Sequence, residues 1–582
     1  MVTGPASPTL ASTWGLDRTG PAWAARVHPP AGGQDHLGLG SVSSDRILPT
    51  LSPGINVLTI HPRYWSFYAW VLDEYWTHKG PKNAANFTPF YRQRDALFAF
   101  ACQLCQAPEH KTLTGNIVGS QRTAGPAREH DEFDPNFEYI KERLGGFGLY
   151  YRATMEATGI ISRADPANGL AYDTVTPQGR ALARAYGKAV ATTRLVSEFL
   201  TQAAVPGPVP KDVLEEFALR GCLCQLRTAE QFDRPLLQDL FTHGGDPDGA
   251  RRRTFQFLLD ACTTAHQTGL NRDRYRELIY FRSLDDGKYV PNTQTTGAAR
   301  QWRLYQAREY FGFALNRLWA WLVRRGHDLS QDGIALVPMT QIRALLEQEL
   351  DANSFVNERE AAGLVITART PATEFLYWIT AQVDITVGID DIWPRHVTLD
   401  EHALYQWCNS RVDDADTLVS MLAVLLLVYQ RIGTLQRLVS LGRDRSIVAE
   451  GSSARIGMER FFTLLRTQME DEPTLLELLV WVYERHIVPQ HERVAMAKLV
   501  NGDTFRFRRV GAAMQFFGGD APATFNDSRF DALSTSIHEL GLVSSLHLPD
   551  RKLTAAGKKL LTTGDLPTGA MEAATTLDVM GA

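Results

Sequence analysis

The chain has 582 residues, of which 44% are hydrophobic and 21% are charged, a composition typical of globular proteins with several domains. Its formal net charge of -5 excludes a basic field over the whole protein, so any contact with nucleic acid must use a local patch. Six cysteines are too few for a disulfide scaffold in so long a chain and suit a reducing cytosol.

Residues 1–45 are rich in Gly, Pro, Ala and Ser, which predicts a flexible N-terminal arm. The opening MVTGPASPTLASTWG has neither a basic n-region nor a continuous apolar core, so no signal peptide is expected. The longest apolar run, LVSMLAVLLLV at 418–428, is too short to cross a bilayer and predicts a buried core helix. We therefore expect a cytoplasmic protein without membrane contact.

Residues 63–77, RYWSFYAWVLDEYWT, predict a helix that is buried on most of its sides. Its apolar side chains form two stripes at spacings of three and four, namely Tyr64, Phe67, Tyr68, Val71 and Tyr75 on one and Trp65, Ala69, Leu72 and Trp76 on the other. The aromatic rings are therefore expected in the core rather than on a platform for stacking bases. Arg63 must be exposed or paired, and Asp73 and Asp95 are its candidate partners.

A second helix is expected at about 91–105 in this N-terminal domain, which we place at 46–204. The run GGFGLYY at 145–151 lacks the strand before it and the helix after it that a dinucleotide site needs, so it predicts a glycine-rich loop leading into an aromatic helix. The proline-rich VPGPVP at 205–210 cannot continue a helix and predicts the end of the domain.

The central domain, 211–470, is nearly all helical in pattern, and the run FLYWITAQVDITVGI at 375–389 is its candidate strand or buried apolar segment. A C-terminal domain at 471–566 is expected to hold helices and two short strands, followed by a flexible tail at 567–582. The clearest helical stretches of the central domain are 211–226, 253–265, 296–325, 339–350 and 416–435.

One pattern occurs twice. ATGIISRADPANGLAYDTVTPQGRALA at 157–183 and HELGLVSSLHLPDRKLTAAGKKLL at 538–561 each predict a helix that stops at a glycine, Gly159 or Gly541. A short β-hairpin then leads to a threonine, Thr176 or Thr554, that can cap the next helix. This order resembles the wing region of winged helix-turn-helix proteins, and in particular the "GLI…LTPxGRALA" phrasing of bacterial members. The fold class expected is mainly α, with two winged helix-turn-helix modules that carry short hairpins.

The resemblance implies either a DNA reader or a module for protein contact or dimerisation. The candidate recognition helix of the second copy, 531–540, has no Arg or Lys, which argues against strong base readout. The best basic patch lies just upstream, where TFRFRR alternates as a strand with arginine on one face; a solvated, salt-bridged face is the alternative. The residues expected to contact DNA phosphates are Arg152, Arg180, Arg184, Lys188, Arg493, Lys498, Arg506, Arg508, Arg509, Arg551, Lys552 and Lys558.

Motifs for metals and catalysis are mostly missing. Cys102 and Cys105 have zinc-ligand spacing with His110 nearby, but they lie on a predicted helix and a second pair, Cys222 and Cys224, is distant in the sequence. We therefore predict no metal and no cofactor. No G-x-x-x-x-G-K-[ST] phosphate loop occurs. No catalytic residue is assigned, although the carboxylates Asp384, Asp390 and Asp391, with Asp285 and Asp286 beside Lys288, were considered for metal-dependent cleavage.

The phrases PGINVLT…RYWSFYAW, YYR…GII…TPQGRALA and HERVAMAKL…TFRF resemble large bacterial proteins of phage-defence and mobile-element loci, whose activity is not established. The resemblance implies a DNA-linked complex. The function expected is a non-enzymatic, DNA-associated or scaffolding component of a bacterial multi-protein system, with double-stranded DNA and proteins of the same locus as partners. The alternatives are a purely protein-binding subunit and a nuclease whose site the sequence does not show.

Overall fold

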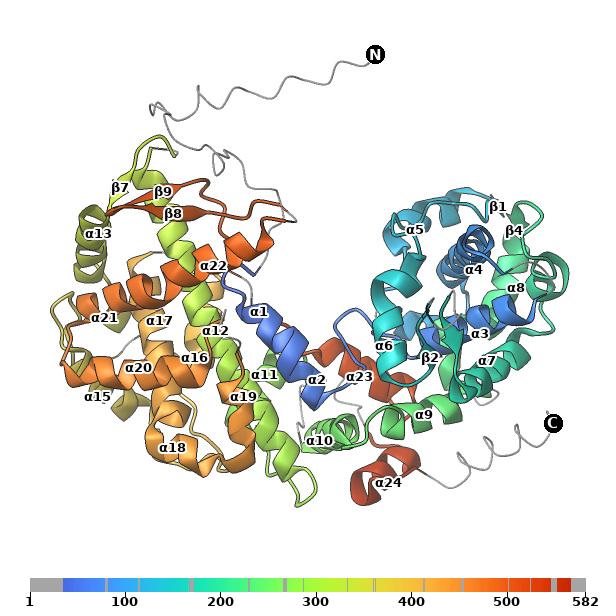
Figure 1. Ribbon diagram of the computed structural model, residues 1–582. Helices are drawn as coiled ribbons and strands as arrows, with labels where there is room; N and C mark the ends of the chain where they lie inside the picture. The colour runs from blue at the N-terminus through green and yellow to red at the C-terminus, as the bar shows by residue number, and fades with distance from the viewer. Residues whose placement is uncertain are drawn as a thin grey trace, which may run out of the picture. The chain divides into compact units, whose positions relative to one another are not determined.

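The fold is mainly helical, with four small antiparallel sheets among the described residues (Figure 1). A computed structural model of the protein describes residues 35–78, 82–113, 116–165, 167, 172–228, 231–264, 269–285, 287–331, 333–359, 361, 363–411, 414–451, 455–500, 502–523, 525–545 and 552–566. The expected tail at 567–582, most of the expected arm, Asp286 and Arg551 lie outside these residues. The mainly α class is confirmed.

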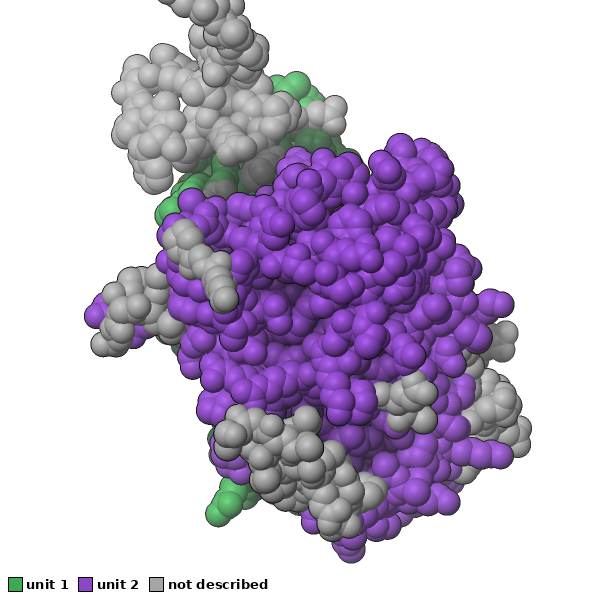
Figure 2. Space-filling view, turned by 90° about the vertical axis from the view of Figure 1, so that its right-hand side faces the viewer, with its two compact units in different colours: residues 1–47, 276–284, 300–526 green, residues 48–275, 285–299, 527–582 purple. Residues whose placement is uncertain are grey.

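The chain divides into two compact units, each assembled from segments far apart in the sequence (Figure 2). Unit 1 combines residues 1–47, 276–284 and 300–526, and unit 2 combines residues 48–275, 285–299 and 527–582. The units therefore do not follow the order of domains along the chain that the sequence predicts, because residues 527–582 belong to the same unit as residues 48–275. Helices α11 (Arg272–Phe281) and α12 (Thr296–Leu329) contribute residues to both units.

Unit 2 is built around helix α3 (Arg63–Thr77), whose bounds match the predicted helix. Every side chain from Arg63 to Leu72 is buried, and Phe67 stacks on Phe98 of α4 with 3.9 Å between ring centroids. The aromatic rings are thus core, as predicted. The other elements of unit 2 are α2 (Leu48–Leu51), α4 (Ala84–Leu104), η3 (Pro108–Thr112), α5 (Ser120–Glu129), β1 (Glu132–Phe133), η4 (Phe147–Tyr151), α6 (Arg152–Ala157), β2 (Ile161–Ser162), β3 (Thr174–Val175), α7 (Pro177–Val190), η6 (Leu195–Phe199), β4 (Val209–Pro210), α8 (Lys211–Gly221), η7 (Leu223–Arg227), α9 (Asp233–His243), α10 (Ala250–Thr264), β6 (Gly287–Lys288), α23 (Phe530–Glu539) and α24 (Ala555–Thr563).

Arg63 has a different partner from those expected. Its Nε lies 3.2 Å from Oδ2 of Asp233, and its Nη1 donates to the carbonyl oxygen of Cys222 at 2.6 Å. Asp95 instead accepts hydrogen bonds from three tyrosine hydroxyls and from the Gly146 N–H at 3.0 Å. The expectation was wrong because the partner comes from α9, about 170 residues further along the chain, which sequence proximity does not indicate.

Unit 1 contains the most apolar helix, α17 (Ala415–Val428), in which every side chain from Asp416 to Val428 is buried. Among the described residues, Ala415–Gly433 is the single segment long and apolar enough to cross a membrane, and 89% of its apolar window is buried inside the protein, as in a core helix. The other elements of unit 1 are α1 (Leu39–Val42), η2 (Ser43–Ile47), β5 (Ser283–Leu284), β7 (Val337–Pro338), α13 (Met339–Asp351), α14 (Phe355–Glu358), α15 (Ala372–Val383), α16 (Glu401–Asn409), η8 (Tyr429–Gly433), α18 (Leu435–Ser440), η9 (Gly442–Asp444), α19 (Arg445–Ala449), α20 (Met458–Glu470), α21 (Leu475–Trp481), η10 (Val482–Ile487), α22 (Val488–Lys498), β8 (Phe507–Val510) and β9 (Ala513–Phe516).

Two local expectations differ from the structure. The first part of the run predicted as a strand or buried apolar segment at 375–389 belongs to helix α15 (Ala372–Val383), because Phe375, Ile379 and Val383 recur every four residues and are buried; residues 384–389 form no strand. The proline-rich segment 205–210 lies inside unit 2, where β4 pairs with β1 in antiparallel register. The strand predicted at TFRFRR (504–509) is confirmed for its last three residues, which belong to β8 (Phe507–Val510) at an edge of the three-stranded sheet β7-β9-β8.

Candidate phosphate-binding pocket

A pocket in unit 1 is lined by four arginines and by no acidic residue. Its cavity volume of about 110 Å³ holds a group the size of a few water molecules, such as a phosphate. Three of the arginines, Arg460, Arg485 and Arg493, are exposed, and the fourth, Arg455, is half-buried. The lining residues come from the segment before α20, from α20 itself, from η10 and from α22, and they are Arg455, Ile456, Gly457, Arg460, Phe461, Leu464, Arg485, His486, Gln490 and Arg493.

The pocket lies at the N-terminus of α20. This helix begins at Met458, and its N-cap residue, Gly457, offers no side chain to the first turn. The N–H groups of the first turn of a helix have no partner within the helix, and the helix dipole places partial positive charge there. The free N–H groups of such a helix start can therefore donate hydrogen bonds to a bound anion, and the neighbouring arginines add positive charge to the site.

His486 forms the inner wall of the pocket. Its side chain is buried, and its ring packs against Trp481 and Phe461 at centroid distances of 4.5 and 4.6 Å. Burial, and then the charges of Arg460, Arg493 and Arg485, lower the pKa of His486 to about 4. The imidazole is therefore neutral at pH 7, and its Nε2 finds no hydrogen-bond partner among the described residues.

Two acidic residues that lie next to pocket arginines in the sequence, Glu459 and Glu492, are paired elsewhere. Glu459 pairs with Arg445, and Glu492 pairs with Arg509 at 2.7 Å between Oε2 and Nη2. Each carboxylate therefore balances an arginine outside the pocket. The positive charge inside the pocket is not neutralised by its own lining, which is the electrostatic condition for binding an anion.

The two repeated segments, both in unit 2, have the same local geometry. Gly159 has φ +78° and ends α6, β2 pairs with β3, and Thr176 caps α7 by accepting from the Gly179 N–H at 3.1 Å. The second copy repeats this with Gly541 at φ +72° and with Thr554 accepting from the Gly557 N–H at 3.1 Å. There the hairpin is a single antiparallel bridge, Val543 to Leu553. The helix stop and the threonine cap predicted from the sequence are thus present in both copies, with paired strands in the first and one bridge among the described residues of the second.

The candidate recognition helix α23 is buried along its length. Ala532 to Glu539 are all buried, and Asp531 at its start is half-buried. Within unit 2, Glu539 contacts His61 at 2.7 Å and Leu540 accepts from Gln238 at 2.6 Å. A helix covered in this way cannot enter a major groove without leaving its packing.

In unit 2, the arginines predicted to contact DNA lie in ion pairs or beside acids. Arg152 donates from Nε to Oδ2 of Asp173 at 2.5 Å and from Nη2 to Oδ1 at 2.8 Å. Arg180 Nε lies 3.3 Å from Oδ1 of Asp73. Arg184 is exposed near the same Asp73. Lys188 lies 4.3 Å from the centroid of the Phe232 ring, while Lys552 and Lys558 are exposed.

In unit 1, the predicted residues separate into different environments. Arg493 lines the pocket, whereas Lys498 donates to the carbonyl oxygen of Asp35 at 2.9 Å. On the strand, Arg506 is buried and donates to the carbonyl oxygen of Asp520, which corrects the expectation of an arginine face. Arg508 donates to Oε1 of Gln515 at 3.1 Å, and Arg509 pairs with Glu492.

Arg455, Arg460 and Arg485 are not among the binding residues predicted from the sequence. Arg455 and Arg460 lie in the segment ARIGMER, in which a glycine with an arginine on either side precedes a helix. This pattern could have indicated an anion site in the sequence. Arg485 belongs to the basic segment upstream of the strand, but only the fold brings it to α20. Residues from 455 to 493 meet because η10 and α22 pass beside the start of α20.

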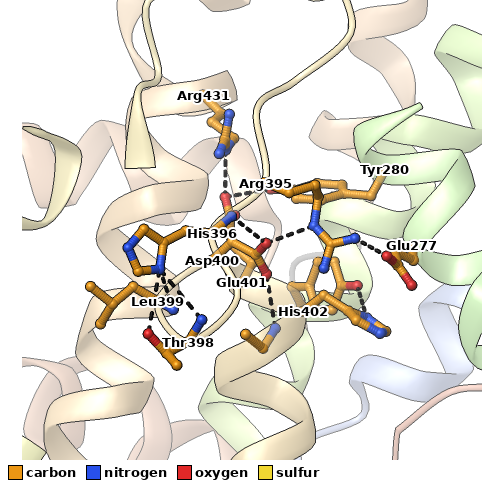
Figure 3. Close-up of polar contacts among 12 residues, drawn as sticks. Glu277, Tyr280, Arg395, His396, Thr398, Leu399, Asp400, Glu401, His402 and Arg431 are labelled. Atoms are coloured by element: carbon orange, nitrogen blue, oxygen red, sulfur yellow. Dashed lines mark hydrogen bonds and ion pairs between the residues drawn. The ribbon is translucent and has the colours of Figure 1, made fainter. Parts of the chain in front are cut away.

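Unit 1 also contains a buried network of acids and arginines (Figure 3). Arg395 bridges Glu277 and Asp400, with 2.7 Å from its Nε to Oδ2 of Asp400, and Arg431 Nε contacts Glu401 Oε1 at 2.7 Å. Asp400 also caps α16 by accepting from the Ala403 N–H. The Asp400 and Glu401 side chains are fully buried, so these contacts join the segment at 395–402 to the core and offer no open site. The further polar contacts shown are Tyr280 to Glu401 and His396 with Thr398 and Leu399.

The carboxylates considered for metal-dependent cleavage do not form a cluster around a lysine. Asp384 accepts from the Thr386 hydroxyl at 2.7 Å, and Asp391 accepts from the Gly388 N–H at 2.6 Å. Asp390 lies 3.3 Å from Arg300. Each of the three is used in a local turn or ion pair.

Comparisons of this chain with protein-family models, with curated proteins and with solved structures give no match. The pocket is therefore interpreted from its own chemistry: four arginines, an uncapped helix start, a buried neutral histidine and no acid in the lining. This combination suits a small oxyanion such as a phosphate group.

Proposed function

We propose that this chain is a non-enzymatic, DNA-associated component of a larger assembly, and that the pocket formed by Arg455, Arg460, Arg485 and Arg493 receives a backbone phosphate. The supporting observation is the concentration of these four arginines at the uncapped start of α20 without an acidic residue in the lining. Phosphate contacts of this kind fix a protein on nucleic acid and carry no base information. Binding is therefore expected to be independent of sequence.

The dimensions of the pocket favour a backbone phosphate over a free nucleotide. The cavity of about 110 Å³ accommodates the phosphate group, and its aromatic member, Phe461, is buried and offers no face for stacking a base. The guanidinium groups of Arg460, Arg485 and Arg493 are exposed, so a phosphate on a larger polymer can reach them.

The two hairpin segments of unit 2 are proposed to be winged-helix modules with a structural or protein-binding role. The burial of α23 and the ion pairs of Arg152 and Arg180 favour this role over groove reading. The placement of the protein in the cytoplasm and in a phage-defence or mobile-element system stays a prediction.

A salt titration of DNA binding tests the proposal. Fluorescence anisotropy with a 20-bp duplex between 50 and 200 mM salt should give a log–log slope of about -1 for the single phosphate in the pocket, and a steeper slope if other phosphates are contacted. The double variant Arg460→Ala/Arg485→Ala should weaken binding by roughly 10- to 100-fold and make the slope shallower by about one. Arg122→Ala, which removes an exposed, paired arginine of unit 2, is the matched control and should bind as the wild type does.

No binding at 50 mM salt, or binding without a salt slope, would reject the DNA proposal. Equal losses in the double variant and in Arg122→Ala would reject the pocket as the contact point. Arg509→Ala, on the strand patch, tests the alternative location, and a larger loss there than in the pocket variant would move the interface to β8.

A second candidate function, protein binding, is supported by apolar side chains at the end of α22. Met496, Leu499 and Val500 are 51%, 39% and 94% exposed. Neighbouring exposed apolar groups favour a partner surface. Unchanged DNA binding together with co-purification of a neighbouring gene product that is lost in Val500→Asp would support this alternative.

A further inference from the structure

The side chains of Cys105, His110, Cys222 and Cys224 converge at one point of unit 2. One candidate ligand atom from each, three sulfurs and an imidazole nitrogen, lies within 4.8 Å of all the others. Cys105 Sγ is 3.7 Å from Cys224 Sγ, and Cys222 Sγ is 3.5 Å from His110 Nδ1. Cys222 and Cys224 are distant from Cys105 in the sequence, which argues against a shared metal site. The fold removes that objection, because the end of α4 packs beside the turn between α8 and η7.

The two distances match the edges of a zinc tetrahedron. Zn–S bonds of about 2.3 Å and Zn–N bonds of about 2.0 Å require S–S edges of about 3.8 Å and S–N edges of about 3.5 Å. Cys102 contacts Cys222 but is not among the four side chains whose ligand atoms converge, so the Cys-x-x-Cys pair is not the candidate ligand pair. The candidate ligands are instead Cys105 and His110 on one side and Cys222 and Cys224 on the other.

The donor set identifies the class of metal. Thiolate ligands select zinc, copper(I) or iron–sulfur clusters, and a three-cysteine, one-histidine set is a common set of structural zinc ligands. All four corners are protein atoms, and the three cysteines are buried and free of disulfides. A closed site of this kind holds one ion for stability and leaves no position for a substrate.

Groups around the cluster hold its loops in place. Gln225 donates from Nε2 to Cys224 Sγ at 3.3 Å, and Arg63 donates to the Cys222 carbonyl at 2.6 Å. Such outer contacts orient metal ligands and their loops. The η7 loop also carries Arg227, which donates to the carbonyl oxygen of Ser544 at 2.9 Å and so contacts the second hairpin segment.

We propose that Cys105, His110, Cys222 and Cys224 bind one structural Zn²⁺ ion, which joins the end of α4 to the α8–η7 turn. The ion closes a chain loop of more than one hundred residues between Cys105 and Cys222. Cross-links over long loops remove the most conformational entropy from the unfolded chain. The same ion stabilises the platform on which the second hairpin segment rests.

Metal analysis of the purified full-length chain tests this site. The wild type should contain about one zinc ion per chain, and Cys224→Ser and Cys105→Ser should each contain less than about 0.1. The matched control is Cys262→Ser, another buried cysteine of unit 2 that is not in the cluster, and it should keep its zinc. Zinc at the same level in Cys224→Ser as in the wild type, or equal loss in Cys262→Ser, would overturn the assignment.

A spectroscopic measurement on the wild type keeps the test independent of variants that fail to fold. Replacing the bound metal with Co²⁺ should give the visible absorption and the thiolate charge-transfer bands of a tetrahedral sulfur-rich site. A Co²⁺ spectrum typical of six oxygen ligands, or no uptake of Co²⁺, would contradict the proposal. DNA binding is not needed for either readout, so failure here is distinct from failure of the proposed function.

Discussion

Arg63, the first residue of the aromatic helix, donates a hydrogen bond to the backbone carbonyl of Cys222 while its Nε contacts Asp233. Both side chains of the ion pair are fully buried. Through these two contacts, the Arg63 side chain joins α3 both to α9 and to the turn that carries two of the proposed zinc ligands. Loss of the Arg63 side chain should therefore disturb both the packing of α3 and the position of that turn.

Replacing Arg63 by Met should lower the free energy of unfolding by roughly 3–5 kcal/mol, because it leaves Asp233 as a buried charge without its partner. Urea denaturation followed by tryptophan fluorescence measures the change. Arg122→Met removes an exposed pair and should alter stability by less than about 1 kcal/mol. Equal effects of the two substitutions would show that the Arg63 pair contributes nothing beyond a surface salt bridge.

The glycines after the two capping threonines should not tolerate a side chain. A Cβ at Gly179 would lie 2.1 Å from the carbonyl oxygen of Ile160, and one at Gly557 would lie 2.0 Å from that of Leu542. Gly179→Ala and Gly557→Ala should each destabilise the protein by about 1–3 kcal/mol, since the hairpin must move away from the helix.

Gly297→Ala is the control for both glycine substitutions, because a Cβ there meets no atom within 4 Å in the first turn of α12. It should be neutral or should stabilise the protein by up to about 1 kcal/mol. Thermal denaturation of the three variants gives the comparison. If Gly179→Ala is as stable as Gly297→Ala, the close packing of hairpin and helix is not required.

The free energy of unfolding should decrease at acidic pH because His486 is buried in its neutral form. Its pKa is lowered to about 4 in the folded protein, mainly by burial, against about 6.5 in the unfolded chain, so the unfolded chain takes up the proton first. The contribution to stability is present above pH 6.5 and is lost as the pH falls towards 4, by up to roughly 3 kcal/mol. In His486→Phe, which keeps the aromatic contacts, the unfolding free energy should change less between pH 7 and pH 4.5. An unchanged pH dependence in this variant would contradict the assignment.

Asp95 should make the protein less stable as the pH rises, which is the opposite direction to the effect of His486. Burial raises its pKa to about 6, although the hydroxyls of Tyr139, Tyr91 and Tyr68 partly offset the shift. Because the unfolded value is about 3.9, the stability contributed by the protonated form is complete below pH 4 and is lost as the pH rises through 6, to a total of about 3 kcal/mol. Asp95→Asn should flatten this part of the profile. A steeper profile in the variant would show that the ionised carboxylate is the favoured form.

The sequence alone determined the local structure of this protein. The bounds of α3, the buried run in α17 and the two helix–hairpin–cap segments follow from spacing, glycine stops and threonine caps, which act over a few residues. Only the tertiary structure decided what meets across the chain: Arg63 with Asp233, Cys105 with Cys224, and Arg460 with Arg485 and Arg493. A single sequence does not show such meetings, because they depend on how helices pack and not on the residues between them. The same packing buries α23, which is why we propose the phosphate contact at the pocket and not at the hairpin segments.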